Sequence, residues 1–224
     1  KQKIHARVPP KRRNKNRQEV TTRVLVVSEG TVTEPDYFDR LKEKIRSKFS
    51  AQLIVRPNSK AKSSSGGRHP DPIHVVKECI SLRNKDSEKY SADNDVSPYA
   101  LCFAVVDVDS YGEINKTGSS TLEKAIKLAD SNGVQVIVSN IKFEVWLLWH
   151  LLENIPSERS ELDNLCQKNK VLVGGKHLAN NFPVENYEEA CVRADRRQKV
   201  DLHKIGSNPS TAMPRFFEML RSYQ

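Results

Sequence analysis

Three predominantly apolar runs place the strongest constraint on how this chain folds. They lie at residues 22–28, 99–107 and 134–138, and segments with apolar residues at helical spacing separate them. A strand that is apolar on both faces must be covered on both faces, and parallel sheets obtain this cover from the helices that connect their strands. The alternation therefore predicts an α/β fold with a mainly parallel sheet flanked by helices.

The remaining patterns extend this fold to about residue 155. Residues 51–56 add a strand, which gives a sheet of about four strands, and helices are expected at residues 33–49, 71–90, 122–132 and 143–152. Beyond Pro156 the sequence has amphipathic helical patterns without clear strands. We therefore expect an α/β core over residues 23–155 and a helical C-terminal subdomain over residues 156–224 that packs on this core.

Most of the positive charge lies at the N-terminus. Residues 1–23 contain nine Lys and Arg residues and one acidic residue, so they carry +8 of the net charge of +9. Their polar composition predicts a flexible basic arm over residues 1–22. Lys11, Arg12 and Arg13 are candidate nucleic-acid-binding residues because basic side chains neutralise phosphates. A solubilising tail explains the same charge equally well.

The composition argues against a membrane protein and against a zinc protein. Charged residues make up 29% of the chain, and no apolar run approaches the roughly 20 residues that a membrane-spanning helix needs. The four cysteines are far apart and show no CxxC spacing, which favours a reduced, cytoplasmic protein. An oligomer is compatible with this composition.

Acidic residues follow the apolar strands. The apolar run at residues 99–107 ends in Asp107, and Asp109 follows two positions later; strand residues two apart project to the same side. Two like charges at that distance are unfavourable unless a cation lies between them. We therefore expect Asp107 and Asp109 to lie side by side and to hold a divalent metal ion.

Two other strand ends carry polar groups toward the same edge. Glu29 follows the first strand, and Glu144 comes shortly after the fourth. The carboxyl ends of parallel strands share one edge of the sheet, which is where ligands bind in α/β folds. A site with only oxygen ligands predicts Mg²⁺ or Mn²⁺. Glu29 could instead act as a general acid or base, which requires a raised pKa.

Several further candidates have a structural explanation as well. Glu34 and Glu144 are candidate metal ligands, but an acid in the first turn of a helix is also stabilised by the helix dipole. His150 lies six residues beyond Glu144, about 240° around a regular helix, so a packed histidine is favoured over a ligand. A cluster at Arg193, Arg196 and Arg197 is either a solvated helix face or a track for phosphates.

Four blocks of sequence resemble the motifs of the RloB-like protein family. They are Ser28–Phe38, Val106–Asp109, Ser139–His150 and Asn208–Thr211. One departure is Ile141, where the family more usually has proline, and we expect it to alter the turn before Glu144. By itself, the Asn208–Thr211 block reads as the start of a helix capped by Ser210 or Thr211.

The resemblance implies a Toprim-like fold, related to Rossmann-like domains and to the nuclease domains of OLD-type proteins. It matches Glu29, Asp107 and Asp109 to acidic site residues, and it places Glu34, Glu144 and His150 in motif blocks. Lys176 would correspond to a late lysine that stabilises the phosphate, although a surface lysine in a glycine turn is an equal alternative. The resemblance also implies bacterial antiphage defence together with an ATPase encoded nearby.

The leading hypothesis is a nuclease that uses Mg²⁺ or Mn²⁺ to cleave phosphodiester bonds in DNA or RNA, since metal ions held by carboxylates neutralise phosphate and activate water. The alternative is a non-catalytic module that binds nucleic acid or nucleotides and works with a partner ATPase. A response-regulator-like domain is disfavoured, because that layout needs its acidic pair after the first strand.

Overall fold

Five strands form one sheet in this computed structural model, which describes residues 22–57, 71–90, 97–113 and 119–223. The strands are β1 (Thr22–Ser28), β2 (Ala51–Arg56), β3 (Leu101–Asp107), β4 (Gln135–Asn140) and β7 (Ser210–Thr211). Their order is β2-β1-β3-β4-β7, with the first four parallel and β7 antiparallel to β4. The predicted α/β fold with a mainly parallel sheet is confirmed, and it is compatible with a Rossmann-like or Toprim-like fold.

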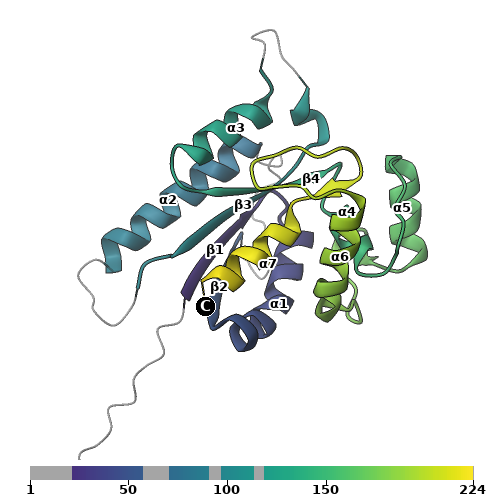
Figure 1. The fold of residues 1–224 in the computed structure, drawn as a ribbon, viewed down its shortest axis with the longest axis horizontal. Coiled ribbons are helices and arrows are strands. Elements are labelled where there is room, and N and C mark those ends of the chain that lie inside the picture. Colours follow the sequence, from purple (N-terminus) through teal and green to yellow (C-terminus); the bar gives the residue numbers. More distant parts are fainter. Residues whose placement is uncertain (1–21, 58–70, 91–96, 114–118, 224) are drawn as a thin grey trace, which may run out of the picture.

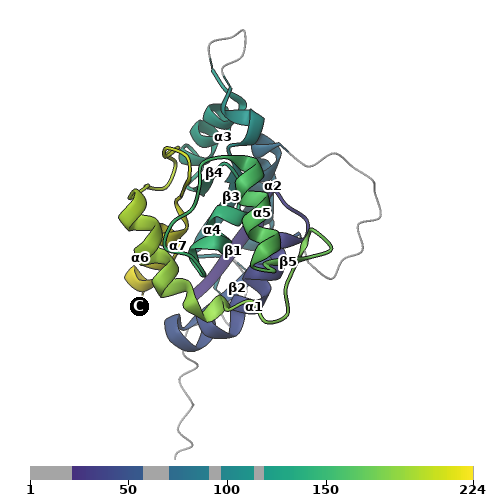
Figure 2. The same cartoon turned by 90° about the vertical axis from the view of Figure 1, so that its right-hand side faces the viewer.

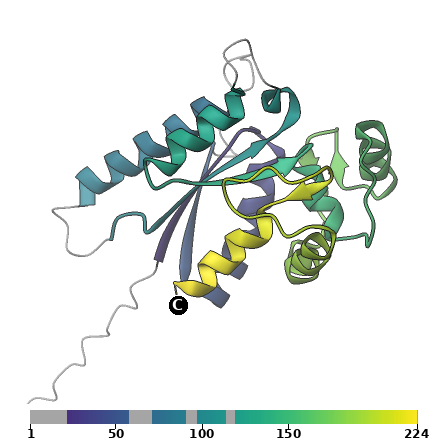
Figure 3. The same ribbon diagram turned by 45° about the horizontal axis from the view of Figure 1, so that its top comes forward.

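Helices cover both faces of the sheet (Figures 1 and 3). One face carries α1 (Thr33–Phe49), α4 (Glu144–Trp149) and α7 (Met213–Ser222), and the other carries α2 (Pro72–Tyr90) and α3 (Thr121–Asp130). Along β1, Val24 and Val26 point into the first layer, whereas Leu25 and Val27 point into the second. Burial on both faces explains why this strand is apolar without interruption.

The C-terminal part differs from the expected helical subdomain, because it contributes to the core sheet. Strand β7 pairs with β4, and the Thr211 hydroxyl lies 2.9 Å from that of Ser139. In α7, the ring of Phe216 packs against Phe103 of β3 at a centroid distance of 5.0 Å. The expectation of no strands beyond Pro156 was wrong because a two-residue strand is too short to show an alternating pattern.

The other C-terminal elements lie beside α4 and α1 (Figure 2). They are α5 (Arg159–Lys168), the hairpin strands β5 (Leu172–Val173) and β6 (His177–Leu178), and α6 (Tyr187–Arg197). The helix expected to be capped by Ser210 or Thr211 begins at Met213, so Ala212 occupies the N-cap position, and the Met213 amide donates to the Thr211 hydroxyl oxygen at 3.2 Å. Among the described residues, no helix is long and apolar enough to cross a membrane.

The strand order reverses between β1 and β3. The chain leaves β1 for β2 on one side of the sheet, whereas β3 and β4 lie on the other side. At such a reversal, the connections after the two central strands diverge and leave a crevice at their carboxyl ends, which is the usual place for a ligand in an open α/β sheet. The residues that follow Ser28 and Val106 therefore lie where a ligand is expected to bind.

Candidate active site

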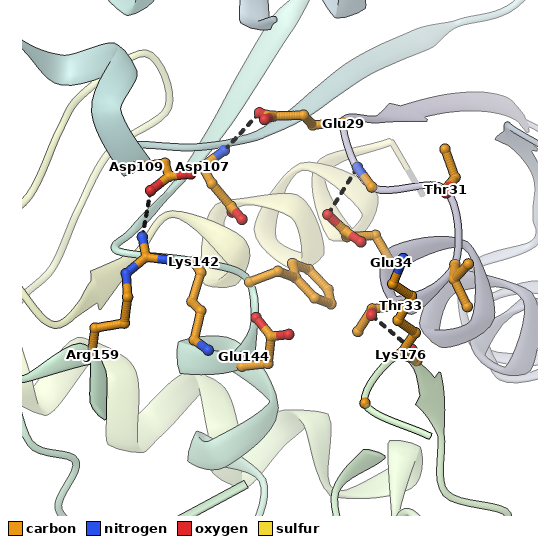
Figure 4. Close-up of a pocket in the computed structure, with 14 residues that line it drawn as sticks. Glu29, Thr31, Thr33, Glu34, Asp107, Asp109, Lys142, Glu144, Arg159 and Lys176 are labelled. Carbon is orange, nitrogen blue, oxygen red and sulfur yellow. Dashed lines mark hydrogen bonds and ion pairs between the residues drawn. The ribbon is translucent and has the colours of Figure 1, made fainter. Parts of the chain in front are cut away.

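A pocket of about 540 Å³ lies at the carboxyl ends of β1 and β3 (Figure 4). It is lined by residues from the loop after β1, from the end of β3, from the segment before α4, from the start of α5 and from the β5–β6 hairpin. The lining residues are Glu29, Gly30, Thr31, Val32, Thr33, Glu34, Asp107, Asp109, Lys142, Phe143, Glu144, Arg159, Gly175 and Lys176. All five acidic residues predicted from the sequence are among them.

Glu29 bridges the two central strands at the crevice. Its backbone amide donates to the Val105 carbonyl at 3.0 Å, and its Oε2 accepts a hydrogen bond from the Asp107 amide at 3.4 Å. Burial raises the pKa of Glu29 to about 7, and the charges of Glu34 and Asp109 raise it further. The hydrogen bond from the Asp107 amide acts in the opposite direction and lowers this pKa. Glu29 thus has the raised pKa that a general acid or base requires.

Glu34 enters the pocket from the first turn of α1. Its Oε1 accepts a hydrogen bond from the Gly30 amide at 3.1 Å, and a Cβ added to Gly30 would lie only 1.9 Å from its Oε2. The absence of a side chain at Gly30 therefore makes room for this carboxylate. Burial raises the pKa of Glu34 to about 7, and repulsion from Glu144 adds to the shift.

Asp107 lies at the centre of this group. Burial raises the pKa of its carboxyl group well above the ordinary value, and the charges of Glu34, Glu144 and Glu29 raise it further. Its Oδ1 is buried and has no hydrogen-bond partner among the described residues. A buried, unpaired carboxylate oxygen among like charges is unfavourable without a proton or a cation. We refer to Glu29, Glu34, Asp107 and Glu144 as the acidic cluster.

Asp109 is placed differently from Asp107. Strand β3 ends at Asp107, and Asp109 begins a 3-10 helix (Asp109–Gly112) with a φ angle of 31°. Its side chain is 51% exposed, and Oδ1 pairs with Arg159 Nη2 at 2.5 Å. The two aspartates line one pocket, as expected, but they differ in burial and partners because the strand ends at Asp107 and Asp109 begins the 3-10 helix.

The donor chemistry of the acidic cluster fits a hard divalent cation. Its members offer only carboxylate oxygens, and Asp107 has an oxygen without a partner among the described residues. Mg²⁺ and Mn²⁺ prefer such ligands. In the part of the chain that the structure describes, however, no three acidic, histidine or cysteine side chains are already spaced to hold a metal ion. Binding would therefore require these side chains to draw together.

Lys176 reaches the pocket from the turn between β5 and β6. Gly174 and Gly175 form this turn with φ angles of 60° and 74°, which favour glycine. The turn is fixed to the start of α1, where the Thr33 hydroxyl donates to the Lys176 carbonyl at 2.7 Å. Farther along, Asp36 Oδ2 lies 3.1 Å from His177 Nδ1.

The family model described as RloB-like protein matches residues 24–220. The chain belongs to the RloB-like protein family. The match includes every residue that lines the pocket. No curated protein and no solved structure matches the chain.

One RloB motif block contains Ile141 and Glu144. The peptide bond between Asn140 and Ile141 is cis. Glu144 begins α4, lines the pocket and adds to the charge around Asp107. Glu144 therefore joins the acidic cluster from the start of α4, three residues after Ile141.

His150 does not line the pocket of this RloB-like protein. It is buried beyond the end of α4, with Nε2 3.3 Å from the Tyr37 hydroxyl and Nδ1 3.1 Å from the Trp146 carbonyl oxygen. Burial lowers its pKa to about 3, so the ring is neutral near pH 7. The favoured interpretation of a packed histidine is confirmed. Trp146 and Trp149 are also buried, as the apolar pattern of the helix predicts.

The predicted basic surfaces lie elsewhere. Arg193 and Arg196 both pair with Glu153, Arg197 is exposed on α6, and none of the three lines the pocket. Arg196 and Arg197 agree with a solvated helix face, whereas the Arg193 side chain is only 20% exposed and donates to the Trp149 and His150 carbonyls. A role of the three arginines in phosphate binding stays a prediction. Lys11, Arg12 and Arg13 lie outside the described residues.

Two cationic pocket residues, Lys142 and Arg159, were not predicted from the sequence. Lys142 lies within the Ser139–His150 block, but neither it nor Arg159 belongs to a basic cluster or a spacing that marks a site. They reach the pocket because the segment before α4 and the start of α5 fold back over the end of β3 (Figure 4).

Proposed function

We propose that this RloB-like protein is a divalent-metal-dependent nuclease that cleaves phosphodiester bonds of DNA or RNA at the pocket. The observation that carries the proposal is the buried Asp107 carboxylate, whose Oδ1 has no partner among the described residues while three other acids surround it. A cation is the partner that such an arrangement favours most. The pocket is open to a substrate and combines carboxylates with basic side chains.

The acidic cluster would hold the metal, with Asp107 as the central ligand and Glu34, Glu144, Glu29 and Asp109 available around it. Bound there, Mg²⁺ or Mn²⁺ would neutralise phosphate charge and activate a water molecule for attack. Two metal ions and one metal ion are both compatible with this number of carboxylates.

The chain's own residues supply the remaining chemistry. Without metal, burial raises the pKa of Glu29 to about 7; if Glu29 does not ligate the metal, its carboxyl group would serve as the general acid or base. Lys176 lines the pocket, and its ammonium group would stabilise the negative charge that develops on the phosphate in the transition state. Thr33 holds the Lys176 backbone, which positions this lysine relative to α1.

Family membership supports the biological setting of the proposal. We propose that the protein acts in the cytoplasm as an effector of bacterial antiphage defence, together with an ATPase encoded nearby. The direct experiment incubates the purified full chain with DNA, tRNA and other RNA in Mg²⁺ or Mn²⁺, with and without that ATPase. Cleavage that Asp107→Asn abolishes supports the proposal, and no cleavage under any of these conditions contradicts it.

A non-catalytic module that binds nucleic acid or nucleotides is the second candidate. It is favoured by one observation, that no three potential ligands among the described residues are already spaced for a metal ion. The double variant Asp107→Ala, Asp109→Ala separates the two. Loss of cleavage with retained binding supports the nuclease, whereas loss of binding by a protein that never cleaves supports the module.

A further inference from the structure

Three basic side chains, Lys142, Arg159 and Lys176, share the pocket with the acids. Lys142 is already paired with Asp163 of α5, and its side chain is only 15% exposed. Lys176 makes no ion pair among the described residues and enters from the hairpin (Figure 4). Arg159 lies on the opposite side from Lys176 in this view and reaches toward Asp109.

The backbone that carries Arg159 is anchored. Arg159 is the first residue of α5, and the preceding segment is bound to the strand β7 region by two hydrogen bonds. The Ser157 hydroxyl donates to the Asn208 carbonyl at 3.1 Å, and the Asn208 side-chain amide donates to the Ser157 carbonyl at 2.6 Å. The base of Arg159 is therefore fixed near the end of β3, while its 48% exposed side chain can change partners.

Arg159 uses little of its hydrogen-bonding capacity in this state. Within the described residues, its guanidinium makes a single contact, from Nη2 to Asp109 Oδ1. An arginine side chain has five N–H donors in a planar fork that matches the oxygens of a phosphate. An ion pair that is half exposed contributes little stability. A divalent ion and a phosphate would therefore both compete effectively for its two members.

We infer that Arg159 binds a phosphate group of the nucleic-acid backbone, and that its ion pair with Asp109 opens when a divalent cation takes the Asp109 carboxylate. This rests on the proposed function, since it assigns the substrate phosphate to the same pocket. Asp109 and Arg159 then form an exchange pair: without metal each neutralises the other, and with metal the carboxylate turns to the cation and the guanidinium to the phosphate.

The test compares the full chain with Arg159→Ala and with Arg221→Ala as the matched control. Arg221 also pairs with a carboxylate, that of Glu188, and its side chain is 46% exposed, but it does not line the pocket. Calorimetry with Mn²⁺ alone is expected to show about two- to fivefold tighter binding by Arg159→Ala, because the competing cation has been removed. The Asp109→Asn variant should not gain affinity when Arg159→Ala is added to it.

The second readout is the affinity for labelled single-stranded DNA and RNA oligonucleotides, measured by fluorescence anisotropy with Ca²⁺ in place of Mg²⁺. Arg159→Ala should bind at least about tenfold more weakly, which is the loss expected for one charged hydrogen bond to phosphate. The oligonucleotide affinity of Arg159→Lys should lie between those of the wild-type protein and Arg159→Ala, since a lysine keeps the charge but not the planar fork of donors. Arg221→Ala should match the wild-type protein in both measurements.

The outcomes separate this inference from the proposed function. If the wild-type protein binds Mn²⁺ and Arg159→Ala leaves either affinity unchanged, or weakens Mn²⁺ binding, the inference is overturned while the metal site stands. If the wild-type protein binds no Mn²⁺, both are overturned. Thermal unfolding of each variant verifies that the fold is retained.

Discussion

The carboxylate of Glu34 occupies the space in which a side chain at position 30 would lie, and it accepts a hydrogen bond from the Gly30 amide at 3.1 Å. We therefore expect Gly30→Ala to displace Glu34 from the acidic cluster. The clash falls on the far end of a flexible side chain, so the fold should be retained. Calorimetry should show Mn²⁺ binding weakened about as much as in Glu34→Gln.

A double variant tests this mechanism. If Gly30→Ala acts through Glu34, adding Glu34→Gln to it should cause little further loss of Mn²⁺ affinity, because two changes that remove one interaction are not additive. Two full and independent losses would show that Gly30 affects metal binding by another route.

The raised pKa of Glu34 makes metal-free stability dependent on pH. Its folded pKa is about 7, above the ordinary 4.5, so the folded state binds the extra proton and stability is lost as pH rises from about 4.5 through 7. Glu34→Gln mimics the protonated form. Urea unfolding should show similar stability for both proteins at pH 5, and Glu34→Gln more stable by up to about 3 kcal/mol at pH 8.

Divalent metal should reverse this difference. If the acidic cluster binds Mn²⁺, adding the ion at pH 8 should stabilise the wild-type protein more than Glu34→Gln. Equal stabilisation of the two proteins, or a stability difference that does not change between pH 5 and pH 8, would contradict the assigned role of Glu34.

His150 should produce the opposite pH dependence. Its pKa is lowered to about 3 from 6.5 by burial, so the unfolded state binds the extra proton and stability is lost as pH falls through this interval. His150→Phe should remove this part of the acid sensitivity, although it loses the hydrogen bonds of the ring. The Mn²⁺ affinity of His150→Phe at pH 7.5 should equal that of the wild-type protein. A large loss of affinity would indicate that His150 is a metal ligand.

The hairpin that presents Lys176 depends on α1. The Asp36 carboxylate contacts His177 and the Leu178 amide, and Arg40 donates to the carbonyls of Leu178 and Ala179. We expect Asp36→Ala to loosen the hairpin and to lower kcat by roughly 10-fold or more, through lost positioning of Lys176. The effect should largely vanish when Lys176 is already alanine. An unchanged loss in that background would contradict a positioning role.

The sequence was most informative where the pattern was long and periodic. The apolar run of β1 predicted a strand buried on both faces, and residues after β1, β3 and β4 were correctly expected at one edge of the sheet. Such signals work because the two faces of a strand alternate with a fixed period. The rule that the carboxyl ends of parallel strands share one edge placed Glu29 and Asp107 in one expected site.

The features that the sequence did not predict depend on contacts between residues that are far apart in the sequence. The two residues of β7 are too few for a pattern, yet they complete the sheet beside β4. Arg159 meets Asp109 across 50 positions, and nothing near either residue indicates that contact. The alternation rule also failed at Asp109, because the chain turns into a 3-10 helix directly after the strand.

The central claim is that the acidic cluster holds a divalent cation at Asp107. The most direct measurement is a crystal structure of the full chain with Mn²⁺, with anomalous difference density used to locate the ion. We predict a peak in the pocket within about 2.0–2.4 Å of an Asp107 oxygen, with a second ligand from Glu29, Glu34 or Glu144. Saturating Mn²⁺ with no peak in this pocket, or with a peak that Asp107 does not contact, would contradict the account.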